Sequence, residues 1–273
     1  MAKTFQVERP SQRLRRSTLQ RHVVKGFAFR VLFAAAGLLI ELVPTFADDH
    51  TPGYKWGKPI EWSDGNGPEA REHGAFIVDE NRQRAILIGG SGYRPQFSPL
   101  ADVWELQLTT DRWRRLTPVA STPLGGSRRV AQLPRQTKAY LFGGYKKNQA
   151  THNELICVDF SNETPTFETI WQTNPPPGRC LHAFAYDSDQ NQFLLFGGVD
   201  SRSGTILNDL WRMSLQNGRA LWTRLEPKDP PSARYGFSWG YDSATGQLIV
   251  FGGAQGLLPL NPANDTWVLS TRA

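Results

Sequence analysis

Arginines recur along the chain, each ahead of a Gly-Gly pair. The set is Arg71, Arg128 or Arg129, Arg179 and Arg234. A guanidinium group offers forked donors that match a carboxylate or a phosphate, so four of them brought together would bind an anion. An acid follows each Gly-Gly pair, and the alternative is that each arginine pairs with it and holds the repeat together. These acids are Asp102, Glu154, Asp209 and Asp265.

Other groups capable of chemistry are few. Glu72 is the one carboxylate beside these arginines in sequence that could act as a general acid or base. His73 and His182 fall on expected inner strands, where packing is the expected role, because a metal site needs three or four convergent ligands. No Gly-x-Ser-x-Gly elbow or Gly-rich phosphate loop occurs in the sequence. The sequence therefore predicts no catalytic residue, no metal and no cofactor, and leaves an enzymatic role open.

The elements that carry these residues repeat at a fixed period. Four Gly-Gly pairs are spaced 54, 54 and 55 residues apart, and each closes an apolar run. The pairs are Gly89-Gly90, Gly143-Gly144, Gly197-Gly198 and Gly252-Gly253. Short polar turns separate each run from a preceding apolar run, which predicts a hairpin. Such self-similarity indicates one supersecondary unit repeated in space.

Further landmarks complete the unit. After a loop of variable length, the acid is followed two residues later by a bulky side chain, and a further strand carries a tryptophan. The bulky residues are Trp104, Ile156, Trp211 and Trp267, and the later tryptophans are Trp113, Trp171 and Trp222. Each unit is thus expected to form four short antiparallel strands. A series of such units predicts an all-β propeller in which each sheet is a blade.

The order of arginine, apolar strand, Gly-Gly, Asp-x-Trp and a later tryptophan resembles the Kelch repeat, including the galactose oxidase central-domain-like repeats. The resemblance covers roughly residues 55–273, and repeat two departs most, with Glu154 and Ile156 in place of Asp and Trp. It implies that the arginines lie near one mouth of a central channel. The Tyr, His and Cys cluster that galactose oxidase uses for copper cannot be assembled here.

The last blade is expected to take its outer strand from the N-terminal part of the chain. The chain ends on the third strand of unit four, and Pro59-Ile-Glu-Trp62 has the character of the missing outer strand. We expect residues 59–273 to form four four-stranded blades, the last completed by this N-terminal strand, which would leave no free sheet edge. Kelch propellers usually have six or seven blades, so an open arc that self-associates is the alternative to a closed monomer.

The first 47 residues have the composition of a targeting segment. They hold eight basic and two acidic residues, and the remainder balances at 23 of each sign, which argues against nucleic-acid binding. A ten-residue apolar stretch from Val31 to Ile40 suits a signal peptide, with residues 48–58 as a linker. We expect export to the periplasm, the cell envelope or the medium, with membrane anchoring by residues 31–47 as the alternative. Whether Cys157 and Cys180 pair is left open.

The loops after the Gly-Gly pairs differ from repeat to repeat, which is typical of recognition on a rigid scaffold. They carry aromatic, basic and apolar residues of the kinds that anchor interfaces. The residues are Tyr93, Arg94, Phe97, Tyr145, Lys146, Lys147, Arg202, Leu257, Leu258 and Leu260. These features favour an exported binding or scaffold module for a protein or glycan. The alternatives are an enzyme on a small acidic sugar at the arginine-lined mouth, which resemblance to periplasmic Kelch mutarotases implies, and a structural envelope protein.

Overall fold

The computed structural model describes residues 67–92, 97–117, 124–146 and 150–272. The chain divides into two units, Met1–Trp56 and Gly57–Ala273, and all described residues belong to the second. The expected leader, the linker and the strand at 59–62 lie outside the described residues. Within these ranges no helix has the length and apolar character to span a membrane.

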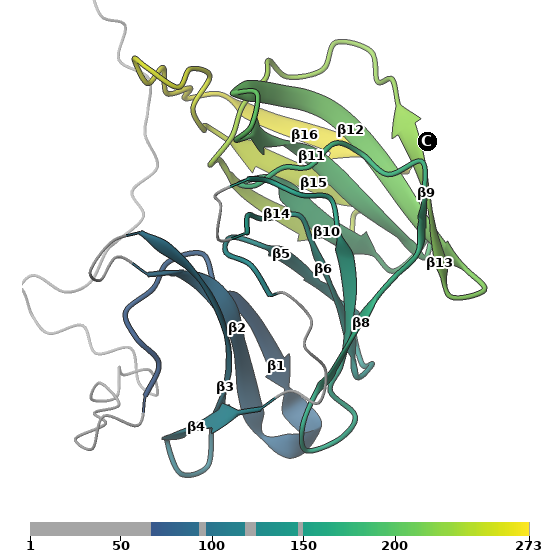
Figure 1. The fold of residues 1–273 in the computed structure, drawn as a ribbon. Coiled ribbons are helices and arrows are strands. Elements are labelled where there is room, and N and C mark those ends of the chain that lie inside the picture. The colour runs from purple at the N-terminus through teal and green to yellow at the C-terminus, as the bar shows by residue number, and fades with distance from the viewer. Residues whose placement is uncertain (1–66, 93–96, 118–123, 147–149, 273) are drawn as a thin grey trace, which may run out of the picture. The chain divides into compact units, whose positions relative to one another are not determined.

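The described residues form four sheets in chain order (Figure 1). Blade 1 contains β1 (Ala75–Asp79), β2 (Arg84–Gly92), β3 (Ser98–Gln107) and β4 (Arg112–Leu116), with the 3-10 turn η1 (Glu80–Arg82) between β1 and β2. Blade 2 contains β5 (Arg129–Gln132), β6 (Lys138–Phe142), β7 (Leu155–Asp159) and β8 (Thr166–Thr169). Blade 3 contains β10 (Ala183–Asp187), β11 (Gln192–Asp200), β12 (Thr205–Gln216) and β13 (Arg219–Leu225), and β9 (Gln172–Thr173) pairs with β13 in parallel. Blade 4 contains β14 (Ser238–Asp242), β15 (Gln247–Phe251) and β16 (Thr266–Ser270).

The Gly-Gly pairs stand where each second strand meets the start of the first. Gly90 has φ of +108°, and a Cβ there would lie 2.8 Å from the carbonyl oxygen of Glu72. Only glycine permits both this backbone conformation and this approach. The register of the second and third strands shifts at the same place, between Ile88 and Gly90 and between Phe196 and Gly198.

Alternate side chains of each strand point to opposite faces of its blade, as the strand period requires. Three hydrophobic clusters result, one between each pair of successive blades. Ile88 packs between blades 1 and 2, Phe142 between blades 2 and 3, and Phe196 between blades 3 and 4. The prediction of an all-β propeller with four Kelch-type blades is confirmed.

The structure corrects the expected place of Trp171 and answers whether Cys157 and Cys180 pair. Trp171 was expected in the outer strand of repeat two, but β8 ends at Thr169 and Trp171 is 71% exposed. Phe167 of β8 packs instead in the cluster between blades 1 and 2, where it lies opposite Val158 of β7. Cys157 and Cys180 are both buried and free, so no disulfide joins them.

Candidate functional site

In blades 1, 3 and 4 the repeat arginine and the blade acid form a bidentate ion pair. In blade 1, Nη1 and Nη2 of Arg71 lie 2.5 and 2.9 Å from the two carboxylate oxygens of Asp102. Arg179 and Asp209 repeat this geometry in blade 3, at 2.5 and 2.8 Å. At these three positions the arginine therefore pairs with the acid of its own repeat, as the alternative to anion binding predicted.

The same arginines also bind the backbone. Nη1 of Arg179 donates to the carbonyl oxygen of Gly197 at 3.0 Å, and Nε donates to that of Pro177 at 3.1 Å. Arg71 and Arg234 make the equivalent contacts in their blades. Each guanidinium therefore ties the approach segment to the Gly-Gly turn and to the third strand. A bound anion would have to displace the blade acid.

The carboxylates are held in their charged form. Burial opposes ionisation of Asp209, but hydrogen bonds from Arg179 and then Trp211 outweigh it and lower the pKa of this group. The pKa of Asp102 is lowered in the same balance, by Arg71 and Trp104. Nε1 of Trp211 lies 2.6 Å from Oδ2 of Asp209, so the acid also orients the tryptophan beside the blade.

Blade 2 departs from this pattern, and the predicted equivalence of Arg128 and Arg129 with the other arginines is wrong. Those arginines stand 18 residues before the glycine carbonyl they bind, and this spacing leads to Gly125 in blade 2. A Cβ at Gly125 would lie 2.2 Å from the carbonyl oxygen of Tyr145, so a side chain is excluded. The bridge between Gly126 and Tyr145 fixes this register.

Arg128 instead stands three residues later, where blade 3 has His182 and blade 4 has Phe237. From there Nη2 reaches Oε2 of Glu154 at 3.0 Å. Arg129 donates from Nε to the carbonyl oxygen of His182 at 3.1 Å and so binds blade 3 rather than its own acid. The anion-binding role assigned from sequence to Arg71, Arg128, Arg129, Arg179 and Arg234 stays a prediction.

Glu154 is the centre of a polar cluster on the loop side of blade 2. Nζ of Lys146 lies 2.5 Å from Oε1, opposite Arg128, and Nδ1 of His152 lies 3.7 Å from Oε2. Burial and then the charge of Arg128 lower the pKa of His152 to about 3, which leaves its imidazole neutral. Burial opposes ionisation of Glu154, and the hydrogen bond from Lys146 helps to lower its pKa. This cluster combines two cations with one anion.

His182 and His73 occupy different positions in the repeat, three residues after Arg179 and two after Arg71. His182 is fully buried and meets Phe142 edge-on, with ring centroids 5.6 Å apart, as a packing residue does. Burial, and then the charges of Arg179 and Arg129, hold the pKa of His182 well below its ordinary value. His73 lies one position earlier, at φ of +54°, with Nδ1 3.2 Å from Glu72 Oε1.

The predicted loop residues are partly brought together. Tyr93, Arg94 and Lys147 lie outside the described residues. The rings of Phe97 and Tyr145 lie 5.6 Å apart, and the hydroxyl of Tyr145 lies 2.7 Å from that of Ser127. The ring contact joins the loops of blades 1 and 2, and the hydroxyl contact lies within blade 2.

The blade 4 loop presents three leucines to solvent. Leu257, Leu258 and Leu260 are 43%, 94% and 64% exposed. Leu257 also lies close to Gly204, since its Cδ1 would meet a Cβ there at 3.3 Å. The leucines are therefore adjacent to the blade 3 loop that carries the exposed Arg202. We name the set Arg202, Leu257, Leu258 and Leu260 the leucine patch.

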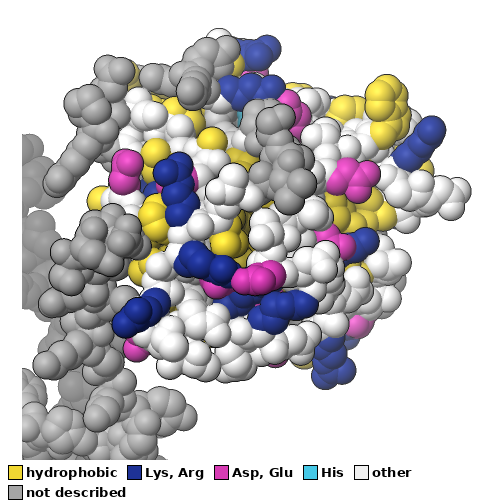
Figure 2. All heavy atoms as spheres, turned by 60° about the horizontal axis from the view of Figure 1, so that its bottom comes forward, with side chains coloured by type: hydrophobic (Ala, Val, Ile, Leu, Met, Phe, Trp, Pro, Cys, Tyr) yellow, Lys and Arg dark blue, Asp and Glu magenta, His cyan; other side chains and the backbone are white. Residues whose placement is uncertain are grey.

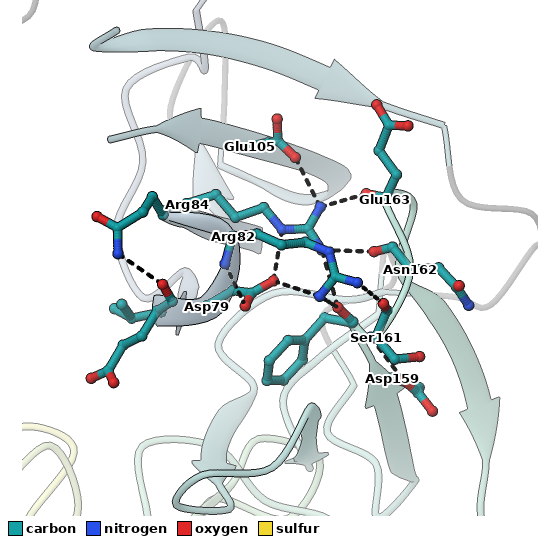
Figure 3. Close-up of polar contacts among 12 residues, drawn as sticks. Asp79, Arg82, Arg84, Glu105, Asp159, Ser161, Asn162 and Glu163 are labelled. Carbon is teal, nitrogen blue, oxygen red and sulfur yellow. Dashed lines mark hydrogen bonds and ion pairs between the residues drawn. The ribbon is translucent and has the colours of Figure 1, made fainter. Parts of the chain in front are cut away.

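A buried ionic network joins blades 1 and 2 and was missed by sequence reasoning (Figure 3). Arg84 lies 2.9 Å from both Asp79 Oδ2 and Glu105 Oε2, and Nη2 donates to the carbonyl oxygens of Phe160 and Asn162. The only sequence signal is that this repeat position holds Lys138, Gln192 and Gln247 in the other blades. Because its donors are engaged within the protein, Arg84 is a structural residue.

On the face drawn in Figure 2, the described side chains form no field of a single sign. On one face, basic and acidic side chains lie next to one another with hydrophobic side chains between them (Figure 2). Among the described residues, no group of three or more His, Cys, Asp or Glu side chains could hold a metal ion.

Comparisons with known proteins agree on the repeat. A profile described as the KLHDC2/KLHL20/DRC7 Kelch-repeats domain matches residues 129–273. The putative adagio-like protein 2 of rice (Oryza sativa subsp. japonica) is 28% identical over 68% of this chain and 29% of its own length. The host cell factor homolog hcf-1 of Caenorhabditis elegans is 30% identical over 47% of this chain and 18% of its own length. The solved structure of YjhT superposes with a TM-score of 0.55 at 15% identity, over 72% of this chain and 68% of that chain.

The chain spans less than a third of the length of each of the two curated relatives described above. The structural likeness to YjhT, at its low identity, shows the fold alone.

Proposed function

Because the chain belongs to the KLHDC2/KLHL20/DRC7 family of Kelch-repeat domains, we propose that it is a protein-binding module that engages its partner through the leucine patch. Kelch propellers generally bind proteins, and the loops are where such a scaffold varies. The observation that carries the proposal is the 94% exposure of Leu258, with Leu260 at 64% beside it.

The chemistry of the patch indicates what it would bind. Leucines exposed to water gain about 1.5–3 kcal/mol each when fully buried by a partner. Arg202 on the adjacent loop would favour an acidic residue next to the apolar contact. The partner is therefore expected to be a protein segment that presents apolar side chains beside a carboxylate.

The alternative of an enzyme that acts on a small acidic sugar would need arginines whose donors are available to the sugar. An acidic sugar would need guanidinium donors directed at a ligand carboxylate. In blades 1, 3 and 4 these donors bind Asp102, Asp209 and Asp265 instead. We therefore do not propose an enzymatic role.

A capture experiment tests the binding proposal. The wild-type chain, a Leu258→Asp/Leu260→Asp variant and a Leu108→Asp control are each used as bait in extract of the source cells. Leu108 directly follows β3, is 42% exposed and lies far from the patch in sequence, so it controls for an apolar-to-charged change at an exposed leucine. We expect one reproducible protein with the wild type and the control, and its loss with the double variant. Equal recovery by all three baits would contradict the proposal.

We also propose that the module acts outside the cytoplasm. The basic and apolar composition of residues 1–47 supports export. Fusion of these residues to a reporter that is active only after translocation tests the proposal, and a reporter that stays inactive would overturn it.

A further inference from the structure

The outward face of blade 4 leaves apolar side chains in water. Ile249, Phe251 and Val268 are 38%, 52% and 55% exposed. Phe251 precedes its Gly-Gly pair, as do Ile88, Phe142 and Phe196 in the other blades, which are 3%, 0% and 4% exposed. Each of those three is buried against the blade that follows it. Blade 4 thus presents a surface built for a following blade, which we name the leading face.

Blade 1 presents the opposite surface. Phe76 and Val78 of β1 are 48% and 40% exposed. The position of Phe76 is held by Val130, Phe184 and Trp239 in blades 2, 3 and 4, and each of these packs in the cluster shared with the preceding blade. Phe76 and Val78 therefore form a surface built for a preceding blade, which we name the trailing face. Both faces are exposed at once, so the chain's own blade 1 does not cover its blade 4.

A third feature lies along β16. A hollow of about 100 Å³ is lined by residues that include Leu210, Val250, Trp267 and Leu269. In blades 2 and 3 the outer strand places an aromatic ring in the corresponding interface, Phe167 opposite Val158 and Trp222 opposite Met213. Leu269 is the equivalent of Val158 and Met213, since each of the three stands four residues after the acid of its blade. The hollow is where an outer-strand aromatic of blade 4 would lie.

We propose that one occupant satisfies all three features, a second copy of this chain. The leading face of one copy docks on the trailing face of the other, and residues 59–62 of that second copy pair with β16 and place Trp62 in the hollow. A single copy supplies both parts because Trp62 stands only nine residues before Arg71, comparable to the twelve between Trp222 and Arg234. In the proposed dimer, residues 59–62 would therefore reach the blade that packs on the trailing face of their own chain.

This contact repeats an interface that the chain already makes. Between successive blades a leading face packs on a trailing face three times within the described residues. Two such contacts between two copies close a ring with twice the four sheets of one chain, at the upper end of the ~4–8 blades found in propellers. Closure also covers the outer edge of β16, along which no other described strand lies and which would otherwise template aggregation. The contact is heterologous, because different surfaces of the two copies meet.

Light scattering coupled to size exclusion tests the proposal on the full chain. At micromolar concentration the wild type is expected at the mass of two chains, and Phe251→Asp and Phe76→Asp are each expected at the mass of one. Both phenylalanines are about half exposed, so the substitutions leave the clusters inside the chain intact. Leu258→Asp is the matched control, since it changes an exposed leucine of the leucine patch and should leave the dimer unchanged.

Mixing the two phenylalanine variants gives the most specific result. The Phe251→Asp copy keeps an intact trailing face and the Phe76→Asp copy an intact leading face, so one unaltered interface can form between them. We expect the mixture to recover a dimer, with a larger dissociation constant than that of the wild type. A wild type at the mass of one chain would overturn the proposal, as would a mixture that stays at the mass of one chain. Because neither face includes the leucine patch, failure here is distinguishable from failure of the partner-binding proposal.

Discussion

Arg179 and Asp209 face each other with Nη1 2.5 Å from Oδ1 and Nη2 2.8 Å from Oδ2, and the arginine side chain is fully buried. The guanidinium also binds the carbonyl oxygen of Gly197. This one side chain thus joins three segments of blade 3, which explains why an arginine recurs at this position in three of the four blades.

Removal of that arginine should destabilise the fold. Arg179→Ala leaves Asp209 partly buried without its counter-charge, and breaking such a pair costs about 3–5 kcal/mol. Urea denaturation gives the free energy of unfolding. Arg224→Ala is the control, because the pair of Arg224 with Glu226 is largely exposed and contributes about 0–1 kcal/mol. A loss of stability no larger than that of the control would contradict the structural role of Arg179.

Gly125 should not tolerate a side chain. Gly125→Ala would place Cβ 2.2 Å from the carbonyl oxygen of Tyr145, so the strand start in blade 2 must shift. Overpacking of this kind costs about 1–3 kcal/mol. Gly240→Ala is the matched control, since nothing lies within 4 Å of a Cβ there. Equal thermal stability of the two variants would show that the register of blade 2 is wrong.

Arg84 should matter far more than its exposed neighbour. Arg84→Ala leaves Asp79 and Glu105 buried without their shared cation, with an expected loss of about 3–5 kcal/mol. Arg114 also pairs with Glu105 but is 51% exposed, so Arg114→Ala should cost less than about 1 kcal/mol. Denaturant unfolding of both variants checks the prediction, and similar losses would contradict it.

The sequence predicted the repeat well because it depends on local features. A glycine doublet that ends an apolar run needs no distant contact to be recognised, and neither does the acid two residues before a bulky side chain. Arg128 was misaligned because Gly-Gly-Ser-Arg resembles the Pro-rich approach of the other repeats, whereas the register is set by the pairing of Gly126 with Tyr145. The Arg84 network could not be predicted because its carbonyl partners lie 76 to 79 residues away, in a loop of the next blade.

Stability should fall in mild acid because of two buried histidines. The folded-state pKa is about 3 for His152 and well below the ordinary value of 6.5 for His182, mainly through burial. As the pH falls below about 6.5, these histidines bind protons in the unfolded chain but not in the folded one. The free energy of unfolding therefore decreases by about 1.4 kcal/mol per pH unit for each histidine.

The variant His182→Phe separates this effect from the carboxylates. Phenylalanine occupies the equivalent position in blade 4, as Phe237, and cannot bind a proton. Unfolding measured between pH 6 and pH 5 should show about half the wild-type slope in this variant, with one of the two histidines removed. In the unfolded chain the carboxylates take up protons mainly below about pH 5, so they contribute little in this range. An unchanged slope would show that His182 does not carry the effect.

The most direct test of the account is amide hydrogen exchange of the chain with and without its captured protein partner. Recognition by the leucine patch predicts slower exchange in residues 254–262 and 201–204 on binding, with no change at the paired arginines. Protection confined to the segments around Arg71, Arg179 and Arg234 would contradict it and place recognition at the arginines instead.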